Sequence, residues 1–218
     1  MKLPFTLLLI LFTTVIFGQG NEENFSIEKG VWSLEADFSI NSRNSDFFNE
    51  SNNSSRKEFG FSISPKVGYA INKNLILGLG LGYSYSKFEI ENENVQFLGT
   101  DYSRVNSIGF FPYVKKFFPV SKKLAFNLQG ETSFTFSKNT FENSDNIERE
   151  SKNESFFIGI RPGINFSLTK NILLEANFGS VGYSHISGEI DGVDNLESNS
   201  FAFNFSTSSL IFGMTLLL

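Results

Sequence analysis

The chain has 218 residues, including 27 Phe and 18 Gly, and it contains no Cys. The absence of Cys excludes disulfides, thiolate metal sites and a thiol nucleophile, and the length fits a single all-β domain. With 18 basic and 23 acidic residues the formal net charge is −5. The chain therefore lacks the basic surface that nucleic-acid binding requires, and we expect no nucleic-acid partner.

An apolar segment opens the chain. Lys2 gives it a positive start, residues 3–17 are apolar, and Gly18 is a small residue where a signal peptidase could cut. This pattern predicts a signal peptide over residues 1–18. The apolar run is shorter than the about 20 residues that cross a bilayer as a helix, so any membrane insertion of the mature chain would use strands.

Eight segments alternate between apolar and polar residues, which is the pattern of strands with two different faces. The first runs from Trp32 to Ile40, and the third alternates Leu or Tyr with Gly or Ser. The eight predicted strands, in chain order, are residues 32–40, 59–71, 75–86, 107–114, 124–136, 156–168, 172–184 and 201–218.

The last predicted strand changes parity along its length. Phe201, Phe203 and Phe205 hold one parity, whereas the apolar residues from Leu210 to Leu218 hold the other. A β-bulge over residues 206–209 would bring both sets to one face, because an extra residue reverses the alternation.

Short and long connections alternate between these strands. Residues 72–74, 119–123 and 169–171 are short turns, whereas the other connections are long, polar and acidic, and we expect them to be solvated loops. The predicted loops are residues 41–57, 87–104, 137–154 and 185–200. An up-and-down barrel of an outer membrane has this asymmetry, with short periplasmic turns and long extracellular loops.

The polar faces of the strands are rich in Gly, Ser, Asn and Gln, which suits the narrow interior of an eight-stranded barrel better than a water-facing exterior. We therefore expect the apolar faces to contact lipid, and keep a soluble ligand-binding barrel as an alternative. Aromatic residues near the strand ends predict the two interfacial girdles of a membrane barrel. The predicted girdle residues are Trp32, Tyr69, Tyr83, Tyr85, Phe134 and Phe136.

Charged residues of both signs interrupt the polar faces of five strands. In a lumen closed to water such charges must pair, because an unpaired buried charge costs several kcal/mol. We predict a lumen charge network that closes the barrel, with a gated ion path as the alternative. Its predicted members are Glu35, Asp37, Lys66, Glu131, Arg161 and Glu175.

Three features carry a resemblance to a known family. They are the signal peptide, the strand–turn–strand unit at residues 108–126 with its Phe-Phe-Pro-Tyr-Val run, and the alternating C-terminal strand. The chain resembles the small eight-stranded outer-membrane barrels typified by the OmpA transmembrane domain and OmpX, and in particular the outer membrane protein beta-barrel domain proteins of Bacteroidetes. The resemblance implies an all-β, antiparallel, up-and-down transmembrane barrel over residues 32–218. Residues 19–31 would then form a short periplasmic segment.

This resemblance favours a non-enzymatic protein of the cell outer membrane with a structural or surface-interaction role. We expect a monomer that contacts outer-membrane lipids and lipopolysaccharide and presents four acidic loops to an extracellular partner. A conduit for small solutes or ions is an alternative function, although eight strands leave little room for a pore.

Two sequence patterns raise the question of catalysis or metal binding. His185, Ser187 and Glu189 weakly resemble the His-x-Ser arrangement of barrel lipid A deacylases, in which His activates Ser. In the predicted strand over residues 172–184, however, the odd-numbered side chains face the lumen. His185 would then lie at the rim or inside, away from the acyl chains of the lipid substrate. Glu89, Glu91 and Glu93 match no calcium loop. We therefore predict no metal site and no cofactor, and we predict no catalytic residues while keeping a lipid A-modifying hydrolase as an alternative function.

Overall fold

Antiparallel strands make up almost all of the described part of this computed structural model, which comprises residues 25–49, 52–94, 97–142, 148–190, 193–205 and 210–218. No helix in these ranges is long and apolar enough to cross a membrane. The strands are β1 (Trp32–Asn49), β2 (Asn52–Asn72), β3 (Leu75–Asn94), β4 (Phe97–Pro119), β5 (Leu124–Glu142), β6 (Glu148–Ser167), β7 (Ile172–Phe178), β8 (Ser180–Ile190), β9 (Val193–Asn204) and β10 (Leu210–Leu217).

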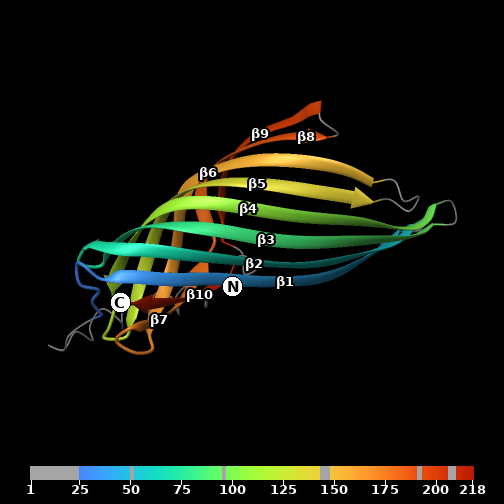
Figure 1. Cartoon of the computed structure of the whole chain (residues 1–218). Helices are drawn as coiled ribbons and strands as arrows, with labels where there is room; N and C mark the ends of the chain where they lie inside the picture. Colours follow the sequence, from blue (N-terminus) through green and yellow to red (C-terminus); the bar gives the residue numbers. More distant parts are fainter. Residues whose placement is uncertain (1–24, 50–51, 95–96, 143–147, 191–192, 206–209) are drawn as a thin grey trace, which may run out of the picture.

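Eight of these strands close into a ring. Each strand from β1 to β6 pairs with the next, β7 pairs with β10, and β10 pairs with β1 (Figure 1). The predicted eight-stranded antiparallel barrel is therefore confirmed. The strand count rises to ten because β7 and β8 are two parts of the predicted seventh strand, and β9 and β10 are two parts of the eighth.

Gly179 divides the predicted seventh strand. Its φ of 72° lies in the left-handed region that favours glycine. On β6, Gly163 pairs with Asn177 before the break, whereas Gly159 pairs with Gly182 after it, so the register has shifted by one residue. Such a shift moves every following side chain to the other face of the sheet.

His185 therefore lies on the outer face of the barrel, opposite Phe156 of β6. The prediction that His185 sits at the rim or inside was wrong. It assumed one unbroken alternation through the strand, and the extra residue at Gly179 reverses that alternation.

The four long connections are mostly strand, so the prediction that they form loops was wrong, although they are solvated as expected. β1 and β2 remain paired from Trp32–Tyr69 to Asn49–Asn52, which takes in residues 41–49 and 52–57. β3 with β4 and β5 with β6 continue in the same way. These extensions have water on both sides and polar cross-strand partners, so they lack the apolar alternation that identifies a strand in the sequence.

The predicted bulge at residues 206–209 lies outside the described residues. On either side of it, Phe203 and Phe205 of one parity and Phe212 and Met214 of the other are all exposed on the outer surface. The apolar side chains on both sides of residues 206–209 thus point outward although their parity differs, as the predicted bulge requires.

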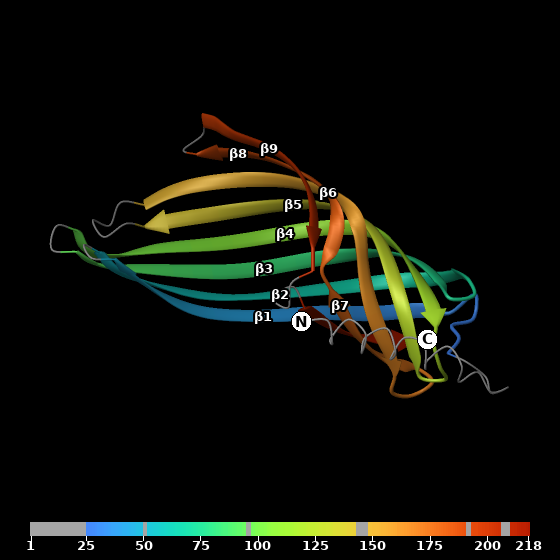
Figure 2. The same cartoon turned by 180° about the vertical axis from the view of Figure 1, so that it is seen from behind.

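The two ends of the barrel differ. We call the end with the short connections the turn end and the opposite end the loop end. Figures 1 and 2 show the chain termini of the described part near the turn end, while at the loop end β8 and β9 lie away from β1. Within the described ranges β1 pairs with β10 over Ser33–Phe38, so the described residues close the ring in its turn-end half.

Candidate functional site in the barrel lumen

The N-terminal segment before β1 closes the turn end of the lumen. The backbone N–H of Ile27 donates to Oδ1 of Asn74 at 2.7 Å, and the N–H of Asn74 donates to the carbonyl of Ile27 at 2.9 Å. The N–H of Phe25 donates to the carbonyl of Ser121 at 3.0 Å. These bonds attach the segment to the turns that follow β2 and β4.

An apolar layer fills the lumen at this end, and the attached segment contributes Phe25 and Ile27 to it. The layer buries side chains from the barrel wall as well, so it excludes water across the lumen. Its buried members are Phe25, Ile27, Ala70, Ile76, Tyr113, Phe117, Ala125, Leu173 and Leu217.

Above the apolar layer lies a layer of buried charges. Nζ of Lys115, on β4, lies 2.7 Å and 2.9 Å from the carboxylate oxygens of Glu35 on β1, and 2.8 Å and 2.9 Å from those of Glu175 on β7. Nζ of Lys66, on β2, contacts Glu35 and lies 2.6 Å from Oδ2 of Asp37. Nδ2 of Asn165 donates to Glu175 at 2.8 Å. All these residues are buried.

Sequence reasoning missed Lys115, the residue that joins both halves of this cluster. The predicted fourth strand ended at residue 114, but β4 continues to Pro119. Extending the alternation of Phe111 and Tyr113 by one step would have placed Lys115 on the lumen face. The signal was present, but the run Lys115-Lys116 reads as the polar end of a strand.

The carboxylates of Glu35, Asp37 and Glu175 offer oxygen atoms within 4.8 Å of one another, a spacing that could hold a metal ion. The ammonium groups of Lys66 and Lys115 already contact these oxygens. They take the positions that a cation would occupy, so the arrangement favours a set of buried ion pairs over a metal site.

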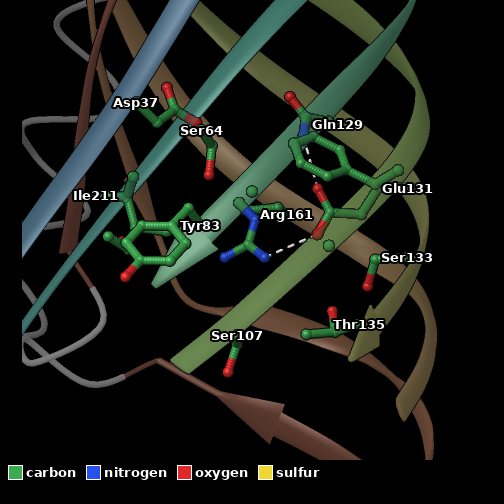
Figure 3. A pocket seen from close by; sticks show the side chains of 14 residues that line it. Asp37, Ser64, Tyr83, Ser107, Gln129, Glu131, Ser133, Thr135, Arg161 and Ile211 are labelled. Atoms are coloured by element: carbon green, nitrogen blue, oxygen red, sulfur yellow. Dashed lines mark hydrogen bonds and ion pairs between the residues drawn. The ribbon is translucent and has the colours of Figure 1, made fainter. Parts of the chain in front are cut away.

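A polar cavity of about 190 Å³ lies above the charged layer, toward the loop end (Figure 3). Nη2 of Arg161 donates to Oε1 of Glu131 at 2.8 Å inside it, and Gln129 donates to Oε2 of Glu131 at 2.6 Å. The predicted network members thus form two groups: Glu131 and Arg161 lie at the cavity, and the other four lie in the charged layer, where Asp37 also lines the cavity. Hydroxyl groups line much of the remaining wall, from Ser62, Ser64, Ser107, Ser133 and Thr135.

The predicted girdle residues lie on the outer surface. Trp32 and Tyr69 are exposed at the turn end, with ring centroids 5.0 Å apart. Nearer the loop end, Tyr83, Phe134 and Phe136 are exposed, and Tyr85 is partly buried with its ring centroid 5.9 Å from that of Phe61.

The candidate catalytic pattern has different partners from those that hydrolysis would need. Nδ1 of His185 lies 2.9 Å from Oδ1 of Asn199 on β9. In the β6–β8 register Ser187 lies opposite Glu154. The contact with Asn199 holds the imidazole toward β9, so His185 has a structural role in joining β8 to β9.

The acidic residues of the β3 extension form surface ion pairs. Nζ of Lys57 lies 2.8 Å from Oε1 of Glu91, and Ser55 donates to Oε2 of Glu91 at 3.2 Å. The hydrogen bonds from Lys57 and Ser55 hold the pKa of the Glu91 carboxyl below its ordinary value. Lys87 contacts Glu89. The side chain of Glu93 lies outside the described residues.

Comparison with known proteins bears on the fold and the family. The model of the outer membrane protein beta-barrel domain family matches residues 28–208. The crystal structure of Neisserial surface protein A aligns with a TM-score of 0.41 and 19% sequence identity, covering 86% of this chain and 99% of that chain. No sequence among the curated proteins matches this chain.

Proposed function

The chain belongs to the outer membrane protein beta-barrel domain family, and from that premise we propose that it is a non-enzymatic surface protein whose closed barrel presents rigid hairpins outside the cell. Members of this family lie in the cell outer membrane, so the soluble-barrel alternative is wrong. The short connections then face the periplasm, and the loop end faces the exterior.

The observation that carries this proposal is the extension of the strands beyond the apolar belt. Among the β1 side chains that the structure describes, the exposed apolar ones end at Ile40, but pairing with β2 continues to Asn49. Ion pairs join neighbouring strands in this region, including Lys57 with Glu91 at 2.8 Å and Arg104 with Glu142 at 3.7 Å. Backbone pairing orders these acidic surfaces before any partner arrives, which lowers the entropy cost of binding.

The layers of the lumen favour a scaffold over a conduit. A solute that entered from the loop end would meet the buried cluster around Lys115 and then the apolar layer around Phe117. Passage would require separating buried ion pairs and displacing the N-terminal segment, and each ion would lose a partner in a dry environment.

The outer surface supports a further part of the proposal, namely contact with outer-membrane lipids and lipopolysaccharide. Exposed Phe, Leu and Ile side chains cover the middle of the barrel, and aromatic residues lie toward both of its ends. One chain closes the ring by itself in the turn-end half, which favours a monomer.

Shortening the hairpins tests the surface role. In the β1–β2 register Arg43 pairs with Glu58, so replacing residues 44–57 by Asn-Gly removes equal lengths of both strands and leaves the barrel register unchanged. The other hairpins can be shortened by the same rule. Adhesion of intact cells, to one another and to surfaces, is compared for cells that lack the protein and cells that carry the native or the shortened form.

We expect the shortened form to reach the outer membrane and to keep heat-modifiable migration on a gel, but to lose adhesion to the level of cells without the protein. Lys116→Gln, far from the hairpins, is the matched control and should adhere normally. Adhesion that survives shortening of all four hairpins would refute the proposal. Discrete conductance of the native protein in a planar bilayer would favour the conduit instead.

A further inference from the structure

The pairing between β1 and β10 stops at Phe38–Phe212, in the middle of the apolar belt. Beyond this point β1 pairs with β2 and β9 pairs with β8, and the described residues include no pairing between β1 and β9. A cleft of about 690 Å³ lies where the ladder ends. Phe38, Ile40, Leu210 and Phe212 line it with apolar side chains, and its polar lining comes from Ser39, Asn41, Ser42, Arg43 and Glu58.

The cleft adjoins the lumen cavity. Asp37 and Ile211 line the cavity, while their chain neighbours Phe38, Leu210 and Phe212 line the cleft. The hydroxyl groups of Ser39, in the cleft, and Ser62, in the cavity, lie 2.8 Å apart. A polar chamber inside the barrel and a partly apolar opening in its wall therefore meet along the end of one ladder.

We propose that the cavity and the cleft together form a binding site for a single-chain amphiphile with a small uncharged head. The head lies in the lumen cavity, and the acyl chain leaves between β1 and the eighth strand into the membrane. The side of the cleft formed by Phe38, Leu210 and Phe212 suits an acyl chain because these side chains and the surrounding lipid are both apolar.

The cavity wall selects the kind of head. Its charges are already paired, Glu131 with Arg161 at 2.8 Å and Asp37 with Lys66 at 2.6 Å. A charged head would have to break one of these pairs, whereas hydroxyl or amide groups can bond to the Ser and Thr side chains. The volume of about 190 Å³ corresponds to roughly six water molecules at about 30 Å³ each, which is enough for a glycerol-sized head.

One buried acceptor points to such a ligand. Asp37 is 7% exposed and lines the cavity, and its Oδ1 atom has no hydrogen-bond partner within the described residues. A buried carboxylate oxygen without a donor is costly. A head hydroxyl group would supply the missing donor while Oδ2 of Asp37 keeps its contact with Lys66.

Fluorescence quenching by a monoacylglycerol with a brominated acyl chain tests the site. The full-length protein in lipid vesicles carries Trp32→Phe, which removes its single Trp, and Phe212→Trp as the reporter in the cleft. Phe110→Trp on β4 is the matched control, because Phe110 and Phe212 are 44% and 50% exposed to the membrane. We expect quenching at position 212 to saturate at low probe content, and quenching at position 110 to follow the bulk lipid composition.

Filling the cavity should remove the saturable component. A Cβ at Gly82 would have its nearest neighbours at 3.7 Å and 3.9 Å, so Gly82→Leu extends into the cavity without a backbone clash. Ser133→Leu, from another strand of the cavity wall, is a second filler if the first does not show heat-modifiable migration. A brominated fatty acid, with its charged head, should bind more weakly than the monoacylglycerol.

Two results would overturn the proposal. If quenching at position 212 follows the bulk lipid composition, the cleft holds no ligand. This result is expected if β9 pairs with β1 and closes the cleft. Saturable quenching that persists in both filled variants would mean that the head does not enter the lumen. Neither result bears on the hairpins, so this inference and the surface role fail separately.

Discussion

Lys115 on β4 donates to both carboxylate oxygens of Glu175 on β7, at 2.8 Å and 2.9 Å, although these strands are not neighbours in the ring. The same ammonium group contacts Glu35 on β1. One side chain thus joins three parts of the barrel wall across the lumen. Because the three charged groups are buried together, each depends on the others for the solvation that water would otherwise provide.

Lys115→Met should strongly destabilise the barrel. It leaves Glu35 and Glu175 buried with less positive charge, and removing one partner of a buried ion pair costs about 3–5 kcal/mol. Equilibrium unfolding by urea in lipid vesicles measures the free energy of unfolding. Lys116→Met is the control, because Lys116 donates to the Lys73 carbonyl at 3.3 Å and to no other group in the described part of the chain, and it should change stability by less than about 0.5 kcal/mol.

Adding Glu35→Gln and Glu175→Gln to Lys115→Met should recover part of the lost stability, since neutral groups replace the unpaired charges. If the single variant and its Lys116 control unfold alike, the cluster does not brace the barrel.

Asn74→Gly should release the N-terminal segment from the turn end. Asn74 has a φ of 57°, which Gly adopts without strain, so this change removes the acceptor for Ile27 and keeps the turn. We expect faster proteolysis within residues 25–31, with the barrel intact. Asn74→Ala should show the same release and a further loss of about 1 kcal/mol from backbone strain.

Asn72→Ala controls for general loosening of this turn, because the exposed Oδ1 of Asn72 accepts from the N–H of its neighbour Lys73 and not from residues 25–31. It should leave residues 25–31 protected. Equal proteolysis of the native protein and Asn74→Gly would contradict the role of Asn74 as the anchor.

Gly80→Ala and Gly82→Ala should differ although both lie on the lumen face of β3. A Cβ at Gly80 would overlap the ring of Phe111, whereas at Gly82 the nearest atoms are at 3.7 Å and 3.9 Å. Overpacking of this kind costs about 1–3 kcal/mol, and Gly82→Ala should stay within about 0.5 kcal/mol of the native protein. Urea unfolding compares the two, and the reverse order of stability would show that Phe111 moves freely.

The contact between Lys57 and Glu91 should weaken in acid. The pKa of the Glu91 carboxyl is lowered by the hydrogen bonds from Lys57 and Ser55. The contact therefore contributes its full stability at pH values above the ordinary pKa of Glu, and this contribution is lost as the pH falls through the lowered pKa of Glu91. Hydrogen exchange of the β2–β3 extension, corrected for its intrinsic pH dependence, should accelerate over that range.

Glu91→Gln should abolish this pH dependence, and added salt should reduce it because the pair is exposed. An identical acid response in the native protein and Glu91→Gln would assign the effect to another group.

The sequence by itself determined the membrane-spanning parts of the strands and the face on which each of their side chains lies. Alternation is a local property, so residues such as Leu77 and Gly78 reveal their faces without knowledge of their partners. The same rule identified Glu35, Asp37, Lys66 and Glu175 as lumen residues. It could not identify the hairpin extensions, because strands with water on both sides show no contrast between their faces.

Only the tertiary structure decided which charges meet and where the barrel opens. Lys115 reaches Glu175 because the ring sets β4 and β7 across the lumen, a relationship that no spacing in the sequence encodes. The left-handed conformation of Gly179 moves His185 to the outer face, because one extra residue reverses every later side chain. The end of the β1–β10 ladder at Phe38 likewise depends on pairing between the first and the last strand of the barrel. Local alternation does not predict such long-range pairing.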